Sequence, residues 1–138
     1  MTFSSSLFRF LWVVVGCVWA GLGSLEVTAQ PVRNGSVQVE LVSPVASVQP
    51  GTSFWVAVRL DHDPHWHTYW LNAGTGYPTS ITWTLPEGYK AGPIVWPAPH
   101  AVKDRAGTVT GNGYEDRAYL FTEISVPASA RPGETVAM

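Results

Sequence analysis

The fold is decided by residues 64–99, which read PHWHTYWLNAGTGYPTSITWTLPEGYKAGPIVWPAP. Four of the seven tryptophans in the chain stand here, and glycines and prolines separate the aromatic segments from one another. Aromatic and β-branched residues favour strands, whereas Gly and Pro favour the turns that join them. The stretch therefore predicts short strands connected by turns, which is the pattern of a small β-sandwich.

Apolar residues at every second position predict more strands on both sides of this stretch. Residues 37–41 show the alternation of a half-buried strand, and residues 94–96 are a short segment that stops at Pro97, as an edge strand does. The predicted strands cover residues 37–41, 54–60, 65–71, 81–85, 94–96 and 117–126. The polar residues 100–113 predict a long loop, and residues 134–138 predict the beginning of another strand.

The regular succession of strands and turns, without helical periodicity, predicts an all-β chain with an immunoglobulin-like antiparallel β-sandwich. Because the last predicted strand is only begun at Met138, we expect the sandwich to be incomplete at its C-terminus. The predicted organisation is a signal peptide over residues 1–29, a linker over residues 30–36 and the sandwich domain over residues 37–138.

The composition argues against several classes of protein. The net charge is −2 and only 13% of the residues are charged, whereas nucleic-acid binders usually carry a basic patch. We therefore expect no nucleic-acid partner. The 13 glycines and 11 prolines do not suit a helical bundle, and 46% hydrophobic residues argue against intrinsic disorder.

The N-terminus has the features of a secretory signal peptide. Arg9 precedes an apolar run over residues 10–23, and residues 27–29 offer a cleavage site before Gln30. One alternative is a membrane anchor, although this run is shorter than the ~20 residues that a spanning helix needs. The other is lipidation at Cys17, where the preceding apolar run is short and apolar sequence continues afterwards.

Cys17 is the only cysteine, and it lies in the segment that we expect to be removed. Residues 30–138 therefore contain no thiol, so this part of the chain cannot form a disulfide, attack one or bind a metal through cysteine. Thiol chemistry in the mature protein requires cysteines from another segment or another chain.

Three histidines have a spacing that metal sites use. On a predicted strand His65 and His67 point to the same side, next to His62, and imidazoles bind zinc or copper. Only His100 is available elsewhere to complete a ligand set. The favoured interpretation is that these side chains flank an aromatic strand, so we expect no metal site and no cofactor.

No spacing of carboxylates or hydroxyls points to catalysis, and we expect no catalytic residue. Asp104, Glu115 and Asp116 are interpreted as solvated loop charges. Tyr77 and Tyr114 are predicted to lie in loops, where side chains often contact partners, so they are the candidate partner-binding residues.

Aromatic residues at strand spacing form either a ligand platform or a core. Core packing and cross-strand pairing are the commoner outcome, so we expect most of them, Trp70 and Trp83 in particular, to be buried. The residues concerned are Trp66, Tyr69, Trp70, Trp83 and Trp96.

Five aromatic and Gly/Pro motifs follow one another in the sequence. They are Trp66-His67-Thr68-Tyr69-Trp70, Asn72-x-Gly74-x-Gly76-x-Pro78-Thr79, Ile81-x-Trp83-x-Leu85-Pro86-x-Gly88, Gly92-x-Ile94-x-Trp96-Pro97-x-Pro99 and Gly113-Tyr114. In this order they resemble the N-terminal periplasmic region of DsbD-type thiol:disulfide interchange proteins, and the ScsB-like branch more than the best-known DsbD domain. The resemblance runs from about Val37 to the end of the chain.

This resemblance implies an immunoglobulin-like periplasmic module of a protein-disulfide reductase. Such a module takes electrons from a membrane-embedded thiol domain of the same or a neighbouring protein. It passes them to periplasmic thioredoxin-like proteins, which include disulfide isomerases and cytochrome c maturation proteins. The resemblance also implies a cysteine pair in a strand beyond the turn at Pro132 and Gly133, which is not in this sequence. The alternative is a non-enzymatic periplasmic module that binds copper or a partner protein.

Overall fold

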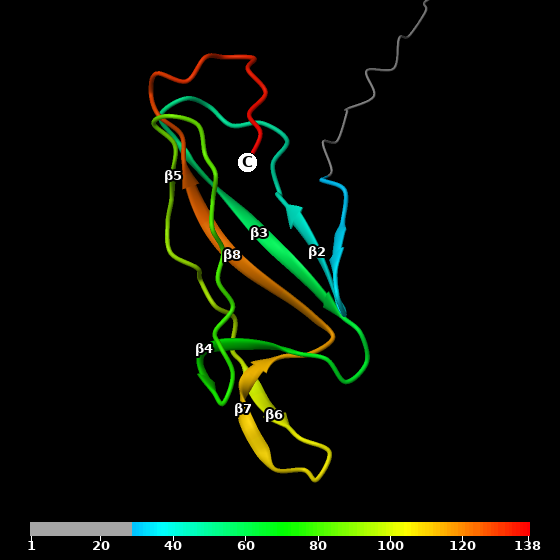
Figure 1. The fold of residues 1–138 in the computed structure, drawn as a ribbon. Coiled ribbons are helices and arrows are strands. Elements are labelled where there is room, and N and C mark those ends of the chain that lie inside the picture. Colours follow the sequence, from blue (N-terminus) through cyan, green and yellow to red (C-terminus); the bar gives the residue numbers. More distant parts are fainter. Residues whose placement is uncertain (1–28) are drawn as a thin grey trace, which may run out of the picture.

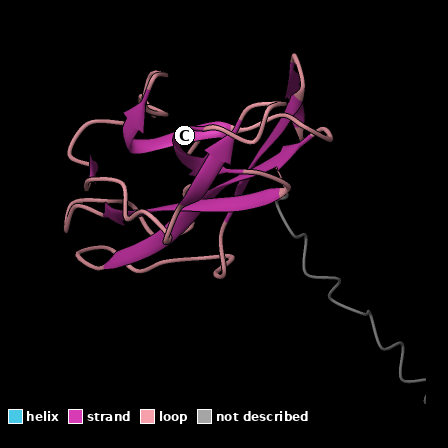
Figure 2. Cartoon of the chain, turned by 90° about the horizontal axis from the view of Figure 1, so that it is seen from below, coloured by secondary structure: helices cyan, strands magenta, loops and turns pink. Residues whose placement is uncertain are grey.

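The computed structural model describes residues 29–138, and this part of the chain contains strands and no helix (Figures 1 and 2). The strands are β1 Val32–Asn34, β2 Val37–Val42, β3 Ser53–His62, β4 Thr68–Gly74, β5 Lys90–Ala91, β6 His100–Lys103, β7 Val109–Tyr114 and β8 Arg117–Ser125. Within residues 29–138, the structure contains no helix that is long and apolar enough to span a membrane. The predicted signal peptide lies, except for Ala29, outside the described residues.

Two antiparallel sheets make up the fold. The larger has the strand order β1-β2-β3-β8-β5, and the smaller has the order β4-β7-β6. The long strands β3 and β8 run side by side through the middle of the molecule, and β4, β6 and β7 lie together at one end (Figure 1). The prediction of an all-β, sandwich-like antiparallel fold is confirmed.

The inner face of β3 and β8 carries the core. Leu60 and Leu120 are each at most 4% exposed, and Val58 lies opposite Leu120 in the β3–β8 register. Burying each such side chain stabilises the fold by about 1.5–3 kcal/mol. The strict alternation of buried and exposed residues along β8 explains why the sequence predicts this strand correctly.

The core cluster also determines where the tryptophans lie. Trp70 and Trp96 are half-buried and pack against the cluster of Leu60, Tyr114, Ala118 and Leu120, and Trp83 is half-buried as well. The prediction of a core position is wrong for Trp66, which is 56% exposed because it precedes β4 in an irregular segment.

The predicted linker over residues 30–36 contains a strand. β1 pairs with β2, so that Asn34 lies opposite Val37 and the chain reverses at Gly35 and Ser36. Gly35 has a φ of 60°, a conformation that glycine adopts without a steric penalty. The prediction of a linker is therefore wrong for residues 32–34.

The predicted loop over residues 100–113 is also wrong, because these residues form the hairpin of β6 and β7. The Asp104 carboxylate accepts hydrogen bonds of 2.9 Å from the backbone N–H groups of Ala106 and Thr108, which fixes the turn. In β7, Gly111 and Gly113 leave room for β4, since a Cβ on Gly111 would stand 2.1 Å from the Ala73 carbonyl oxygen. The strand therefore lacks the apolar alternation on which the sequence argument relied.

Three other predicted strands change in the structure. β4 begins at Thr68 rather than at residue 65, because His65 has a φ of 69°, which is incompatible with a strand. Residues 94–96 keep one bridge, between Val95 and Phe121. Residues 81–85 and residues 134–138 form no strand, since neither segment finds a neighbouring strand for its backbone among the described residues.

Candidate functional site

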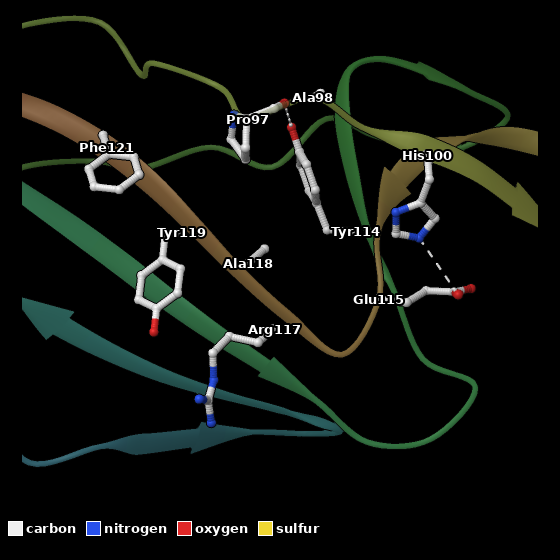
Figure 3. A pocket seen from close by; sticks show the side chains of 9 residues that line it. All are labelled: Pro97, Ala98, His100, Tyr114, Glu115, Arg117, Ala118, Tyr119 and Phe121. Atoms are coloured by element: carbon white, nitrogen blue, oxygen red, sulfur yellow. Dashed lines mark hydrogen bonds and ion pairs between the residues drawn. The ribbon is translucent and has the colours of Figure 1, made fainter.

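A cavity of about 300 Å³ opens beside the first half of β8 (Figure 3). Residues 97–100 form one wall, and the end of β7 with the start of β8 forms the other. Its lining residues are Pro97, Ala98, His100, Tyr114, Glu115, Arg117, Ala118, Tyr119 and Phe121.

Tyr114 holds the two walls together. Its hydroxyl donates a 2.8 Å hydrogen bond to the carbonyl oxygen of Pro97, and its side chain is only 4% exposed (Figure 3). Burial raises the pKa of the Tyr114 hydroxyl, so the phenol stays neutral and remains a donor at physiological pH. The predicted loop position of Tyr114 is wrong, because it is the last residue of β7.

Exposed aromatic side chains form the rim on the β8 side. Tyr119 and Phe121 are 36% and 42% exposed, and their ring centroids are 6.4 Å apart with an interplanar angle of 28°. They share the outer face of β8 because they are two positions apart (Figure 3). The Val95 N–H donates a 2.8 Å hydrogen bond to the Phe121 carbonyl, which anchors the neighbouring segment against this rim.

Polar side chains border the opposite end of the cavity. His100 Nε2 lies 3.6 Å from a Glu115 carboxylate oxygen, and both side chains are exposed (Figure 3). Arg117 points away from the cavity toward β3, where its Nε lies 2.5 Å from an Asp61 oxygen. The hydrogen bond from Arg117, together with the charge of Arg59, holds the pKa of Asp61 below its usual value despite partial burial. This carboxylate is therefore ionised at neutral pH.

The cavity has the composition of a binding surface. It combines two exposed aromatic rings with a histidine and a carboxylate on an open surface. Aromatic side chains of this kind are frequent anchors of protein interfaces.

A second groove, of about 460 Å³, lies over the part of the larger sheet that carries Val58 and Leu60. The apolar inner residues Val37, Val39, Val58 and Leu60 form one side, and residues 79–82 form the other. Hydroxyl groups of Thr68 and Thr79 stand among the lining residues. This groove exists because residues 79–82 face the sheet without a strand beside them.

The two predicted partner-binding residues are not brought together. Tyr77 lies in the loop after β4 and is 92% exposed, as predicted from its loop position, but it is not part of either cavity. Tyr114 lies within the first cavity, below its rim. Sequence reasoning missed Tyr119 and Phe121, although two aromatic residues on the solvent face of the predicted strand 117–126 are a usable signal.

The histidine cluster is separated in the structure. The ring nitrogens of His62 lie 3.0 Å from the Asp116 carbonyl oxygen and 3.0 Å from the Thr68 hydroxyl oxygen, so both already have partners. His67 stands edge-on to the ring of Tyr69 at a centroid distance of 4.9 Å, and the turn at His65 precludes a common strand face. Within residues 29–138, no three side chains of His, Cys, Asp or Glu are arranged to hold a metal ion.

Comparison with known proteins identifies one family. The family model described as "Thiol:disulfide interchange protein DsbD, N-terminal" matches residues 36–137, which is most of the chain. No curated protein and no solved structure shows a significant match.

Proposed function

The chain belongs to the family of DsbD thiol:disulfide interchange protein N-terminal domains, and from this premise we propose that it is the periplasmic module of a protein-disulfide reductase. The family match over residues 36–137 is the observation that carries the proposal. In this proposal the N-terminal segment directs export, and the domain relays electrons from a membrane-embedded thiol domain to periplasmic thioredoxin-like proteins, including those of cytochrome c maturation.

The relay requires thiols that residues 30–138 do not contain. In thiol–disulfide exchange a thiolate attacks a disulfide sulfur, a mixed disulfide forms, and a second thiolate releases it, so that one dithiol is oxidised and one disulfide is reduced. We place those cysteines on a polypeptide segment outside residues 30–138. The residues present here then supply the scaffold and the surface on which a redox partner docks.

The cavity beside β8 is the docking surface in this proposal. Tyr119 and Phe121 offer exposed, rigid aromatic area, and such residues account for much of the binding energy at protein interfaces. The neighbouring pair of His100 and Glu115 provides hydrogen-bonding groups on the rim. Tyr77, which is almost fully exposed, is a second point of contact in the proposal.

The test is a calorimetric titration of the chain, in the form in which the host processes it, with a periplasmic thioredoxin-like protein. We expect Phe121→Ala to weaken binding by about tenfold, which corresponds to loss of about 1.4 kcal/mol. Val109→Ala is the matched control, because Val109 is 57% exposed on β7 and lies outside the cavity. Equal affinity of both variants and the parent would contradict this docking surface.

A non-enzymatic partner-binding module is the second candidate, and the lack of cysteine in residues 30–138 favours it. It predicts the same binding but no exchange of electrons in any complex that also contains the membrane-embedded thiol domain. Formation of a mixed disulfide within such a complex, trapped by acid and detected by mass spectrometry, would support the relay instead. Copper is the weaker form of this candidate, because both ring nitrogens of His62 have protein partners.

A further inference from the structure

Residues 79–86, here called the edge segment, leave most of their backbone hydrogen bonds unmade. The Thr79 N–H donates a 3.1 Å bond to the carbonyl oxygen of Tyr69 in β4. Among the described residues, none of the backbone groups from 80 to 85 has a hydrogen-bond partner in the protein. A segment whose backbone N–H and C=O groups are unpaired in this way is a template for pairing with another strand.

The edge segment nevertheless has the side-chain pattern of a strand. Ile81, Trp83 and Leu85 are half-buried, whereas the residues between them are exposed. No residue of the segment has a positive φ. Successive residues of a strand point their backbone groups to opposite edges, and Thr79 uses its N–H toward β4. In an extended segment with this pattern, the N–H and C=O groups of Thr82 and Thr84 point away from β4.

The sequence of the edge segment is close to symmetrical about Trp83. On either side of it stand Thr82 and Thr84, and beyond these stand Ile81 and Leu85. A segment that reads alike in both directions places like residues opposite each other when it pairs antiparallel with itself. No charged residue lies between 79 and 86, so two copies meet without charge repulsion.

We propose that the edge segments of two copies of this chain pair antiparallel around a two-fold axis at Trp83. Thr82 of each copy then lies opposite Thr84 of the other, and each of these two pairs exchanges two backbone hydrogen bonds. Ile81 lies opposite Leu85, and the two Trp83 residues form the central, non-hydrogen-bonded pair. The result is an isologous dimer in which the two edge segments form a two-stranded antiparallel ribbon between the molecules.

The cross-strand contacts of this register are favourable. Opposed Thr side chains and opposed aromatic side chains are among the pairs that stabilise antiparallel sheets. The exposed side chains of Thr82 and Thr84 lie on the outer surface, and the half-buried Ile81 and Leu85 continue the apolar layer from one copy to the next. Pairing also covers the free backbone row that otherwise invites uncontrolled association.

Charge substitutions at the two threonines test the register. The parent chain, in the form in which the host processes it, is expected to have twice the mass of one chain by size exclusion with light scattering. The variant Thr82→Lys/Thr84→Lys places like charges opposite each other and is expected to have the mass of one chain. The matched control Thr82→Lys/Thr84→Glu places opposite charges in register and is expected to remain a dimer. Mixing the double Lys variant with Thr82→Glu/Thr84→Glu is expected to restore the dimer mass.

Hydrogen exchange on the unmodified chain provides a measurement that needs no variant. The amides of Thr82 and Thr84 are expected to exchange slowly at high concentration and to lose this protection on dilution. A parent chain with the mass of one molecule at every concentration would overturn the proposal. So would a double Lys variant that stays dimeric, or protection of these amides that does not change with concentration.

Discussion

Replacing Gly111 by Ala is expected to loosen the junction between β4 and β7. The new Cβ would stand 2.1 Å from the carbonyl oxygen of Ala73 and 2.9 Å from a ring carbon of Tyr69. Ordinary contact begins near 3.4 Å, so the two strands must separate by more than 1 Å. The obstacle is backbone of a buried residue, since Ala73 is 6% exposed, and not the free end of a flexible side chain.

The expected cost of this change is about 2–3 kcal/mol, the upper range for overpacking a well-packed site. At about 4–8 °C per kcal/mol for a domain of this size, the melting temperature falls by roughly 10–20 °C. The measurement is thermal unfolding of the purified chain, followed by near-UV circular dichroism. Gly111 does not have a positive φ, so the loss is attributable to the contact and not to backbone strain.

Two other glycines distinguish a steric clash from backbone strain as the cause of the expected destabilisation. A Cβ on Gly92 would lie 3.4 Å from the Glu123 carbonyl oxygen, an ordinary distance, so Gly92→Ala is expected to change the melting temperature little. Gly35 has open space around it and a φ of 60°, so Gly35→Ala reports backbone strain alone, about 1 kcal/mol. If Gly111→Ala melts at about the same temperature as Gly92→Ala, the expected clash between β4 and β7 is refuted.

Four more outcomes are expected. Arg117 lowers the pKa of Asp61, so ionised Asp61 stabilises the folded state above the unfolded-state pKa of about 3.9, and this stabilisation is lost as the pH falls through the lower folded-state pKa. The difference in unfolding free energy between the parent and Asp61→Asn should therefore disappear in acid. Titration with zinc or copper should show no one-to-one micromolar binding, because His62 is engaged, and such binding abolished by His62→Ala would contradict this. The processed chain alone should not reduce insulin, since residues 30–138 lack cysteine, and measurable turnover would disprove this. Intact-mass measurement of exported protein should show Gln30 as the first residue, and a product that keeps Met1 would argue for an anchor.

The sequence predicts those strands whose two faces differ in apolar character. β8 has buried and exposed residues in strict alternation, so period two is visible without any knowledge of its neighbours. β3 is recognised from its apolar Phe54, Val56, Val58 and Leu60 at every second position. β7 could not be found in this way, because it contains Gly111 and Gly113, whose lack of a side chain allows β4 to approach closely. The information for that strand lies in a tertiary contact and not in local pattern.

The same distinction explains the errors around the edge segment and the candidate site. Alternation in residues 81–85 correctly reports which side chains face inward, but it does not report whether a neighbouring strand exists. The polar character of residues 100–113 predicts a loop that leads to Tyr114, and only the fold shows that the Tyr114 hydroxyl reaches Pro97. Tyr119 and Phe121 become a rim only because residues 95–97 are anchored beside them.

The pairing of β3 with β8 constrains the order in which the chain acquires structure. Ser53 lies opposite Ser125, so the central pair of the larger sheet joins residues that are far apart in the sequence. The hairpins β1–β2 and β6–β7 close over a few residues and can form early, but the core between the sheets cannot close until β8 is available. Proteins dominated by such distant pairings fold in milliseconds to seconds and not in microseconds. During this interval the edge of β3 that later pairs with β8 is free, which exposes the incompletely folded chain to association with other strands.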